Sequence, residues 1–344
     1  MSSAQCRIFL FTYRRSHLLG RALQSLLSQT FTRWVCEVHN DDPTDPEPGR
    51  LVDQLGDARI SIIDHQVNLG AMASYNLAFT DMSEPYMAML QDDNWWNEDF
   101  LASMIGLLEQ RPEAEVAVSN QWLAVEQADG SWQHPGKSVH PVEDRVYEIQ
   151  WPHWNAVAGA RYADGATVMR SDRLAAMVVP DEAPFDLVEA IRERTFRFPI
   201  LFAADPKAHF AVTRETARGR THGLYGACQA WLATAFFRDV GMDSSTVGQW
   251  VARKSQAPVP PWTLLILCGL AGPDSRWLWR WIPLGGWLRF LAGALKRPAQ
   301  FWQTIWALRK DHVVRQFIDR VTGDQAGNLK KPGRFNDEEV LCLD

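Results

Sequence analysis

The sequence predicts an α/β protein with a largely parallel sheet. Two observations lead to this class: short apolar or β-branched runs alternate with amphipathic segments through the first 125 residues, and the apolar runs have the length of strands. Strands that alternate with helices at this spacing are typical of βαβ units, in which neighbouring strands run parallel. Such sheets bind ligands at the carboxyl ends of their strands. We therefore expect the chemistry in the segments that directly follow the strands.

The expected elements follow one another in a regular order. Leu19, Leu23 and Leu26 share one face of the first expected helix, and Ser16 is its candidate N-cap. We expect strands at 6–12, 34–38, 59–65, 85–90 and 116–126, and helices at 16–30, 70–80 and 98–110. The pattern is looser from 130 to 230, which predicts a mixed continuation that covers the sheet edge and shapes an acceptor site.

Length and composition fit a large globular protein. The chain has 344 residues, of which 46% are hydrophobic, so it can bury a substantial core. Its five cysteines are scattered and form no CxxC pair, which argues against a disulfide framework and a cysteine-rich zinc site. The N-terminal residues lack the pattern of a secretory signal. We therefore expect a protein of the cytoplasm.

Charge is divided unevenly along the chain. Residues 1–249 carry 21 Lys and Arg against 33 Asp and Glu, whereas residues 250–334 carry 14 against 4. Eight of the 16 tryptophans lie between Trp250 and Trp306. Tryptophan favours the headgroup boundary of a bilayer, and basic side chains attract anionic lipid.

This basic, tryptophan-rich composition predicts that residues 258–334 lie on an anionic membrane surface. The apolar runs there are too short or too interrupted to span a bilayer. The alternative is a helical tail that packs its tryptophans on the rest of the chain. Nucleic acid is a distant third, because no nucleic-acid-binding motif accompanies the charge, and we expect no nucleic-acid partner.

Two pairs of adjacent aspartates follow expected strands. Asp92 and Asp93 come directly after YMAML, and Asp41 and Asp42 end the second strand. Adjacent carboxylates repel each other unless a cation compensates, and oxygen ligands suit Mg²⁺ or Mn²⁺, which also bind diphosphate. The residues alone leave a second interpretation open for each pair: the first caps the next helix, and the second forms a turn.

Five motifs in a fixed order resemble family 2 glycosyltransferases of the GT-A fold. They are FTYRR (11–15), SLLSQTFTRWVCEVHNDDPTD (25–45), NLGAMASYNLAF (68–79), YMAMLQDDNWWNEDFL (86–101) and GATVMRSDRL (165–174). The resemblance covers about residues 5–225, and the C-terminal third lies outside it. It implies a GT-A (Rossmann-like) mixed sheet flanked by helices, followed by a helical extension rich in Trp and Arg.

The resemblance divides the chain into two domains. The first is a GT-A domain over residues 1–250, with a nucleotide-binding half at about 1–125 and an acceptor half at about 126–250. The second is the helical, basic extension over residues 251–344.

The resemblance also implies a nucleotide pocket. Thr12 and Tyr13 match the family's TYN motif, in which the tyrosine stacks on a base. Asp42 matches the aspartate that accepts a hydrogen bond from a uracil-type N–H. Asn68 and Gly70 match the NxG loop, where the backbone approaches the donor.

A divalent metal is implied by the same comparison. Asp92 matches the ribose-side member of the DxD-like motif, and Asp93 matches the ligand of Mn²⁺ or Mg²⁺. His222, in RGRTHG, is a further candidate ligand. The neighbouring Trp95 and Trp96 either stack on a sugar or pack in the core.

A general base is implied in the segment DEAPFDLVEAIRERTF. The alignment favours Glu189, with Asp186 as the second candidate. The alternative is that both side chains face solvent, with Glu189 paired to Arg192 at helical spacing.

The sequence departs from the family pattern at three points. Arg14 replaces the usual asparagine, Gln91 stands where many members carry a third acid, and no QxxRW motif follows. The missing motif disfavours a processive polysaccharide synthase and favours the transfer of a single sugar.

The leading hypothesis is an inverting glycosyltransferase that moves one sugar from a UDP-sugar to a hydroxyl of a glycan or lipid-linked acceptor. Its tail would hold it at the inner face of the cell membrane, in the synthesis of cell-envelope polysaccharide. The alternatives are a sugar nucleotidyltransferase and a catalytically inactive GT-A-like binding protein.

Overall fold

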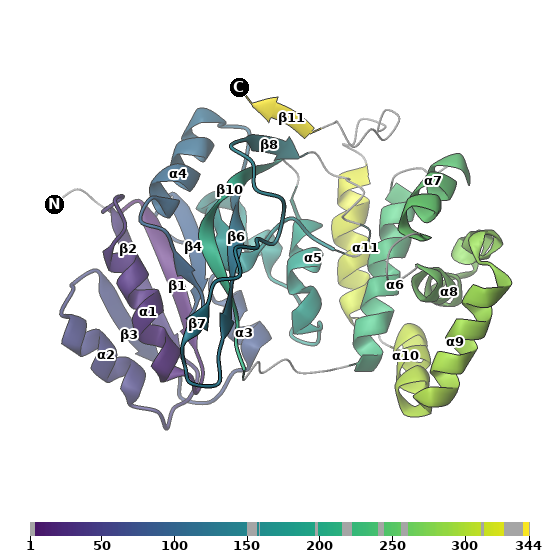
Figure 1. Cartoon of the computed structure of the whole chain (residues 1–344), viewed down its shortest axis with the longest axis horizontal. Coiled ribbons are helices and arrows are strands. Elements are labelled where there is room, and N and C mark those ends of the chain that lie inside the picture. Colours follow the sequence, from purple (N-terminus) through teal and green to yellow (C-terminus); the bar gives the residue numbers. More distant parts are fainter. Residues whose placement is uncertain are drawn as a thin grey trace.

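A mixed sheet forms the centre of the N-terminal part of the molecule (Figure 1). The computed structural model describes residues 4–149, 157, 159–196, 199–214, 222–239, 244–255, 261–310, 313–326 and 340–343. Within these residues the strand order is β11-β8-β10-β6-β9-β4-β1-β2-β3, with β5 beside β10 and β7 beside β6. The strands are β1 (Cys6–Thr12), β2 (Trp34–Asn40), β3 (Ile60–Asp64), β4 (Tyr86–Gln91), β5 (Trp95–Trp96), β6 (Val116–Glu126), β7 (Trp132–Gln133), β8 (Val146–Ile149), β9 (Thr167–Arg170), β10 (Ile200–Val212) and β11 (Val340–Leu343).

The first four main strands run parallel, as the sequence predicts. β1 lies between β2 and β4 and is parallel to both, and β2 is parallel to β3. Thr12 pairs with Asn40 across β1 and β2, and Phe11 pairs with Gln91 across β1 and β4. The carboxyl ends of these strands therefore lie level with one another. The antiparallel β9 is inserted between β4 and β6, which makes the sheet mixed.

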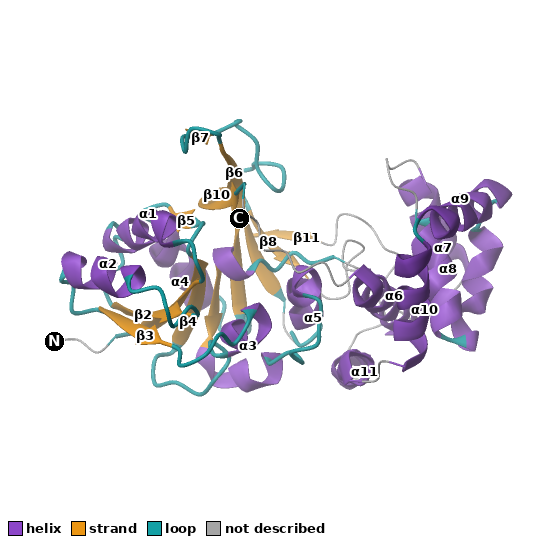
Figure 2. Ribbon diagram, turned by 90° about the horizontal axis from the view of Figure 1, so that it is seen from below, coloured by secondary structure: helices purple, strands orange, loops and turns teal. Residues whose placement is uncertain are grey.

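The helices form two groups (Figure 2). Those beside the sheet are α1 (Ser16–Leu27), α2 (Glu47–Leu55), α3 (Ala71–Asn76), α4 (Phe100–Gln110) and α5 (Val188–Glu193), with the 3₁₀ turns η2 (Asp164–Ala166), η3 (Ser171–Met177) and η4 (Phe185–Leu187). Those at the other end of the molecule are α6 (His222–Asp239), α7 (Ser244–Ser255), α8 (Trp262–Ala271), η5 (Pro273–Trp281), α9 (Leu284–Lys296), α10 (Pro298–Lys310) and α11 (Val313–Ala326). None of these described helices is both long and apolar enough to cross a bilayer.

The two faces of the sheet bury alternate residues of β1. Ile8 and Leu10 point to the side that α1 and α4 cover, whereas Phe9 and Phe11 point to the other side. This alternation is the geometry of a strand whose two faces are both covered. The predicted helix face of Leu19, Leu23 and Leu26 is buried on the first side. These packed layers hold the strand ends in place.

The second helical group has a core of its own that continues into the sheet domain. α6 packs against α8, α10 and α11, and buried side chains of all four belong to one cluster with Leu187, Val188 and Ile191 of the η4–α5 segment. The boundary placed at residue 250 falls inside α7, and in the structure the helical group begins with α6. β11 lies beside β8 in the sheet, although about 190 residues separate them in sequence.

Candidate active site

One arginine holds both aspartates that follow β4. Arg15 Nη2 lies 2.5 Å from Asp92 Oδ1, and Arg15 Nη1 lies 2.7 Å from Asp93 Oδ2. Asp92 is fully buried at the strand end, where its backbone N–H donates to Phe11 O, while the Asp93 side chain is 16% exposed. Arg15 precedes α1, so the β1–α1 turn carries a positive charge to the acids. We call Asp92 and Asp93 the acidic pair.

Burial dominates the electrostatics of the acidic pair. It raises the pKa of Asp92 to about 7, the Asp93 carboxylate adds to the rise, and Arg15 opposes both. The Thr12 hydroxyl and the Tyr13 backbone N–H face the Asp92 carboxyl and also oppose the rise in its pKa. Within the described part of the chain, neither the Thr12 hydroxyl nor Asp92 Oδ2 has a partner at full hydrogen-bond geometry, so Asp92 Oδ2 keeps acceptor capacity for a cation or donor.

The acidic pair fits a divalent cation that brings its remaining ligands with it. Magnesium commonly binds through one or two carboxylates together with substrate phosphates and water. Among the described residues, no group of three or more His, Cys, Asp or Glu side chains converges to hold a metal ion. Asp93, the more accessible acid, and Asp92 are the side chains that would hold such a cation.

The end of β1 and the end of β2 meet at Arg14 and Asp42. Arg14 Nε donates to Asp42 Oδ2 at 2.7 Å, and the Arg14 guanidinium lies 5.0 Å from the centre of the exposed Tyr13 ring. The hydroxyl and the backbone N–H of Thr44 donate to Asp42 Oδ1. Hydrogen bonds from Thr44 and then Arg14 lower the pKa of Asp42 to about 2. Asp42 therefore combines the turn role with a charged, hydrogen-bonding position at the sheet edge.

Asp41, rather than Asp42, holds the loop of residues 68–70. Its carboxylate accepts hydrogen bonds from the backbone N–H groups of Leu69 (2.7 Å) and Gly70 (3.0 Å), and Asn68 Nδ2 donates to its carbonyl oxygen. Gly70 has φ 81°, a left-handed conformation that favours glycine. His65 Nδ1 lies 3.0 Å from Asp41 Oδ1 and completes the network.

Glu189 lies at the start of α5, beside a second buried acid. The backbone N–H of Asp164 donates to Glu189 Oε1 at 3.0 Å. Asp164 is buried, its two carboxylate oxygens both accept from Arg192 Nη1 (2.9 and 3.1 Å), and it accepts a hydrogen bond from the Tyr162 hydroxyl. Burial and then Asp164 raise the pKa of Glu189 to about 8, although Arg192 opposes them. Arg192 thus pairs with Asp164 rather than with Glu189.

Tyr75 of α3 connects the acidic pair to this second acid. Its ring packs 4.9 Å from the rings of both Phe11 and Phe185. Burial raises the pKa of Tyr75, and the negative charges of Asp93, Asp164 and Asp92 raise it further. The Tyr75 phenol of α3 therefore lies within electrostatic range of both the acidic pair and Asp164.

The remaining predicted side chains fall into three situations. Asp186 is exposed in η4. His222 begins α6, and its side chain lies outside the described residues. Trp96 is buried and stacks on Phe100 at 4.3 Å, which is the core-packing alternative, whereas Trp95 stacks on His209 at 4.6 Å and receives the Arg21 guanidinium at 3.7 Å.

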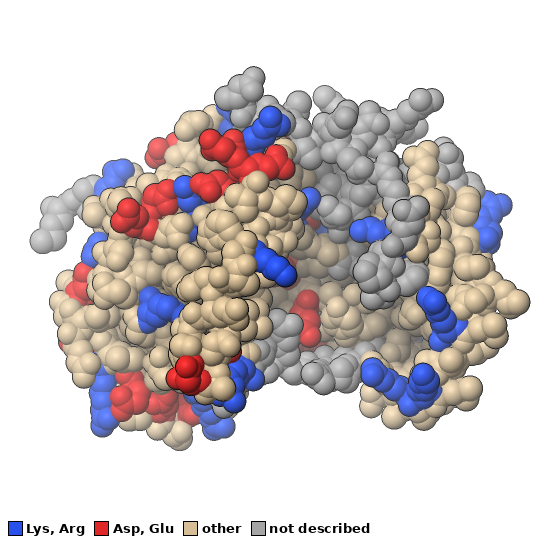
Figure 3. Space-filling view, viewed as in Figure 1, with Lys and Arg blue, Asp and Glu red and all other residues tan. Residues whose placement is uncertain are grey.

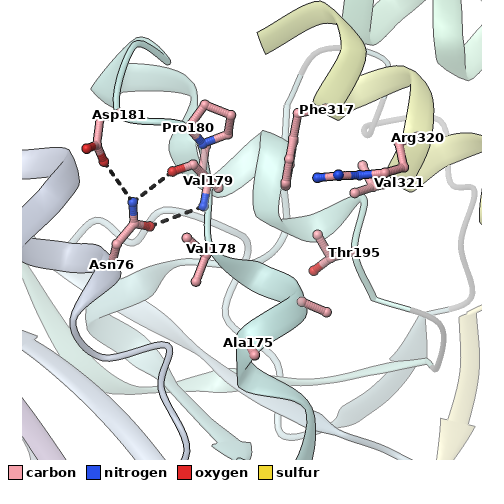
Figure 4. Close-up of a pocket in the computed structure, with 11 residues that line it drawn as sticks. Asn76, Ala175, Val178, Val179, Pro180, Asp181, Thr195, Phe317, Arg320 and Val321 are labelled. Atoms are coloured by element: carbon pink, nitrogen blue, oxygen red, sulfur yellow. Dashed lines mark hydrogen bonds between the residues drawn. The ribbon is translucent and has the colours of Figure 1, made fainter. Parts of the chain in front are cut away.

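A cavity of about 580 Å³ lies apart from these acids, between the sheet domain and α11 (Figure 4). Asn76 borders it and is held by Val179 and Asp181, while its Oδ1 also accepts from Arg192 Nη2 at 3.2 Å. Arg320 extends from α11 at the cavity wall, and its guanidinium lies 5.4 Å from the centre of the Phe317 ring. The Asn76 hydrogen bonds thus join the wall of this cavity to the ion pair behind Glu189.

Three side chains of the site received no role from the sequence: Arg15, Tyr75 and Asp164. Arg15 and Tyr75 lie inside motifs that carry the family resemblance, and Asp164 comes one residue before the fifth motif. Their position inside or directly beside these motifs was therefore the available indication. Their partners lie far along the chain, 77 residues from Arg15 in the case of Asp92.

A family model agrees with this geometry. Residues 8–160 match the model of glycosyl transferase family 2, a span that contains β1 to β8 and the acidic pair. Residues 8–160 of the chain are therefore similar to glycosyl transferase family 2.

Curated relatives match part of the same region. The UDP-Glc:alpha-D-GlcNAc-diphosphoundecaprenol beta-1,3-glucosyltransferase WfgD of Escherichia coli is 26% identical over 101 residues, which are 29% of this chain and 40% of that protein. The putative colanic acid biosynthesis glycosyl transferase WcaA of Escherichia coli (strain K12) is 30% identical over 104 residues, 30% of this chain and 37% of that protein. The matches thus span about two fifths of these relatives.

Solved structures resemble the whole fold. The structure of S. aureus TarS 1-349 in complex with UDP-GlcNAc superimposes with a TM-score of 0.52 at 11% identity and covers 99% of both chains. At this identity the likeness concerns the fold, which is that of a GT-A glycosyltransferase with a helical C-terminal part. The predicted fold class is therefore confirmed.

Proposed function

We propose that the protein transfers a single sugar from a nucleotide-linked donor, a UDP-sugar, to a hydroxyl of a glycan or lipid-linked acceptor in cell-envelope polysaccharide biosynthesis. One observation carries the proposal: the acidic pair follows β4 at the carboxyl edge of the sheet, level with Thr12 and Tyr13 at the end of β1. The names of WfgD and WcaA support the substrate class and the pathway.

The donor would bind along the ends of β1, β2 and β4. Tyr13 is exposed for stacking on a base, and Asp42 stays ionised as an acceptor for an N–H group. The loop held by Asp41 presents the backbone around Gly70 to the donor. Asp93 and Asp92 would hold Mn²⁺ or Mg²⁺ on the diphosphate, and that ion would supply charge neutralisation for the leaving group. Arg15 adds a guanidinium that matches phosphate oxygens geometrically.

The acceptor hydroxyl would be deprotonated by Glu189, with inversion at the anomeric carbon. A general base works best when its pKa is near the operating pH, and Glu189, at about 8, meets that condition. Asp186 is the alternative base, and its side chain is exposed. The reaction would take place at the inner face of the cell membrane, where a lipid-linked acceptor is accessible.

The decisive test measures UDP release from a panel of UDP-, GDP- and dTDP-sugars with undecaprenyl-diphosphate-linked acceptors, with and without Mn²⁺. We expect turnover with a UDP-sugar and loss of turnover in Asp93→Asn. Glu109→Gln, an exposed acid on α4, is the matched control and should retain full activity. Pyrophosphate release from UTP and a sugar phosphate would instead identify a nucleotidyltransferase. Donor binding without turnover of any acceptor would favour the inactive binding protein.

A further inference from the structure

The outer surface of α9 is an exposed apolar stripe. Leu284 (76% exposed), Leu288, Leu291 and Leu295 (83% exposed) recur at intervals of three and four residues, which places them on one face of the helix. Trp302 and Trp306, four residues apart on α10, are each 65% exposed. We call these six side chains the α9–α10 face. Exposed apolar side chains in this number on two helices that contact each other are typical of an interaction site.

This surface belongs to a packed pair of helices rather than to loose ends. The opposite side of α9 is anchored: Gly286 is buried against Trp262 and Ile282, and a side chain at that position would meet the Trp262 ring at 2.9 Å. Phe290 of α9 packs against Phe301 of α10 with ring centres 5.7 Å apart. The exposed leucines and tryptophans are therefore held on a formed platform at the end of the molecule away from the sheet (Figure 2).

Positive charge surrounds the same platform. Residues 284–310 contain five basic side chains and no acidic one: Arg289, Lys296, Arg297, Arg309 and Lys310. Arg289 and Lys296, seven residues apart, run along one flank of the leucine stripe. Figure 3 shows Lys and Arg and no Asp or Glu over α9 and α10 on the face in view. The rest of the visible surface mixes both signs, so this combination is specific to the helical end.

We infer that the α9–α10 face is a membrane-contact surface that lies in the headgroup region of an anionic bilayer. Leucines would enter the acyl boundary, the two tryptophans would sit at the headgroup level, and the basic flank would meet anionic lipid. Charge complementarity selects this occupant: a neutral apolar groove on another protein leaves the five basic side chains without counter-charge. The link between this surface and a lipid-linked acceptor rests on the proposed function. Binding of the protein to a bilayer does not, because it needs no sugar transfer.

Co-sedimentation of the full chain with lipid vesicles tests this inference. We expect partition onto phosphatidylcholine vesicles that contain 30% phosphatidylglycerol, at least tenfold weaker partition onto pure phosphatidylcholine, and a loss as salt rises. The triple variant Leu288→Gln/Leu291→Gln/Leu295→Gln should weaken partition more than tenfold with an unchanged melting temperature, because these side chains are exposed. Each of Lys296→Gln and Arg309→Gln should weaken it about fivefold.

Matched controls separate this inference from the proposed function. Val67→Gln and Val142→Gln replace exposed valines of the sheet domain and should leave partition unchanged. Glu189→Gln should lose turnover and still bind vesicles. Equal sedimentation with and without anionic vesicles would overturn the inference. So would a wild-type dimer that the triple variant dissociates while vesicle binding persists, because the face would then contact a second copy.

Discussion

The two ends of the molecule handle charge in opposite ways. At the sheet edge, Asp92 and Asp164 are buried, and each is held by an arginine, Arg15 or Arg192. At the helical end, the basic side chains of α9 and α10 surround exposed leucines. A buried charge is stable only beside a partner of opposite charge at short distance. An exposed charge is solvated by water and can interact with many counter-charges on another surface. The first arrangement suits precise positioning, and the second suits a fluid surface.

The largest expected effect comes from removing the base at the sheet edge. Glu189→Gln should lower kcat/KM about 10²–10⁴-fold, because a positioned general base contributes this much to a rate. Steady-state kinetics with the UDP-sugar that the donor panel selects would measure this loss. A thermal shift with UDP would show that donor binding persists. Asp186→Asn is the matched control on the same segment. A larger loss in Asp186→Asn than in Glu189→Gln would reverse the assignment of the base.

Arg15→Met tests how strongly the buried charge depends on its partner. We expect a loss of about 3 kcal/mol in the free energy of unfolding, because Asp92 stays buried without a counter-charge. Arg309→Met removes an exposed arginine of the helical end and should change stability by less than about 0.5 kcal/mol. Urea denaturation measures both. Equal losses of stability in the two variants would contradict the difference between the buried charges of the sheet edge and the exposed charges of the helical end. Recovery of stability in the double variant Arg15→Met/Asp92→Asn would support that difference.

The pH dependence of turnover tests the same burial. The pKa of Glu189 is raised to about 8 and that of Asp92 to about 7, so both carboxylates form only as the pH rises through this range. A base must be deprotonated, and kcat/KM should therefore fall about tenfold per pH unit below the controlling pKa. A profile measured from pH 5 to 9 would show an ascending limb above the ordinary carboxyl range. Asp92→Asn should keep that limb if Glu189 controls it, whereas a limb near pH 4 would contradict the assignment.

The smallest expected effects contrast two glycines of the helical end. An added Cβ at Gly269 would lie 2.1 Å from Trp279 Nε1, so Gly269→Ala should cost about 1–3 kcal/mol through displacement of the indole. Gly293, in α9, has open space around it, so Gly293→Ala should stabilise the protein by about 0.5–1 kcal/mol. Thermal unfolding would distinguish the signs. Destabilisation by Gly293→Ala would mean that the outer side of α9 is covered.

Much of the sheet domain follows from local patterns. The strand at 116–126 and the helix over Ser16–Leu27 depend on the spacing of apolar residues over short distances. This spacing can be recognised in the sequence itself. The expected helix at 70–80 is shorter, α3 ending at Asn76, because tertiary contacts rather than periodicity decide where a weakly patterned helix stops. The sequence leaves two roles open for Trp96, stacking on a sugar and packing in the core. Its burial against Phe100 depends on tertiary neighbours that no local pattern predicts.

The local sequence is enough to predict the order of the strands along the chain, the twin acids after YMAML, the basic, tryptophan-rich tail and the resemblance to the family. It does not predict which residues pair with those acids. Arg15 meets Asp92 across 77 positions, Glu189 meets Asp164 across 25, and α6 packs against α8, α10 and α11, which begin 40 to 91 residues after α6 begins. Periodicity is a short-range property of the chain, whereas ion pairing and solvent exposure depend on which distant segments pack together. For that reason, the ion pairs of the buried acids and the exposure of the leucines on α9 emerge only once the chain is folded.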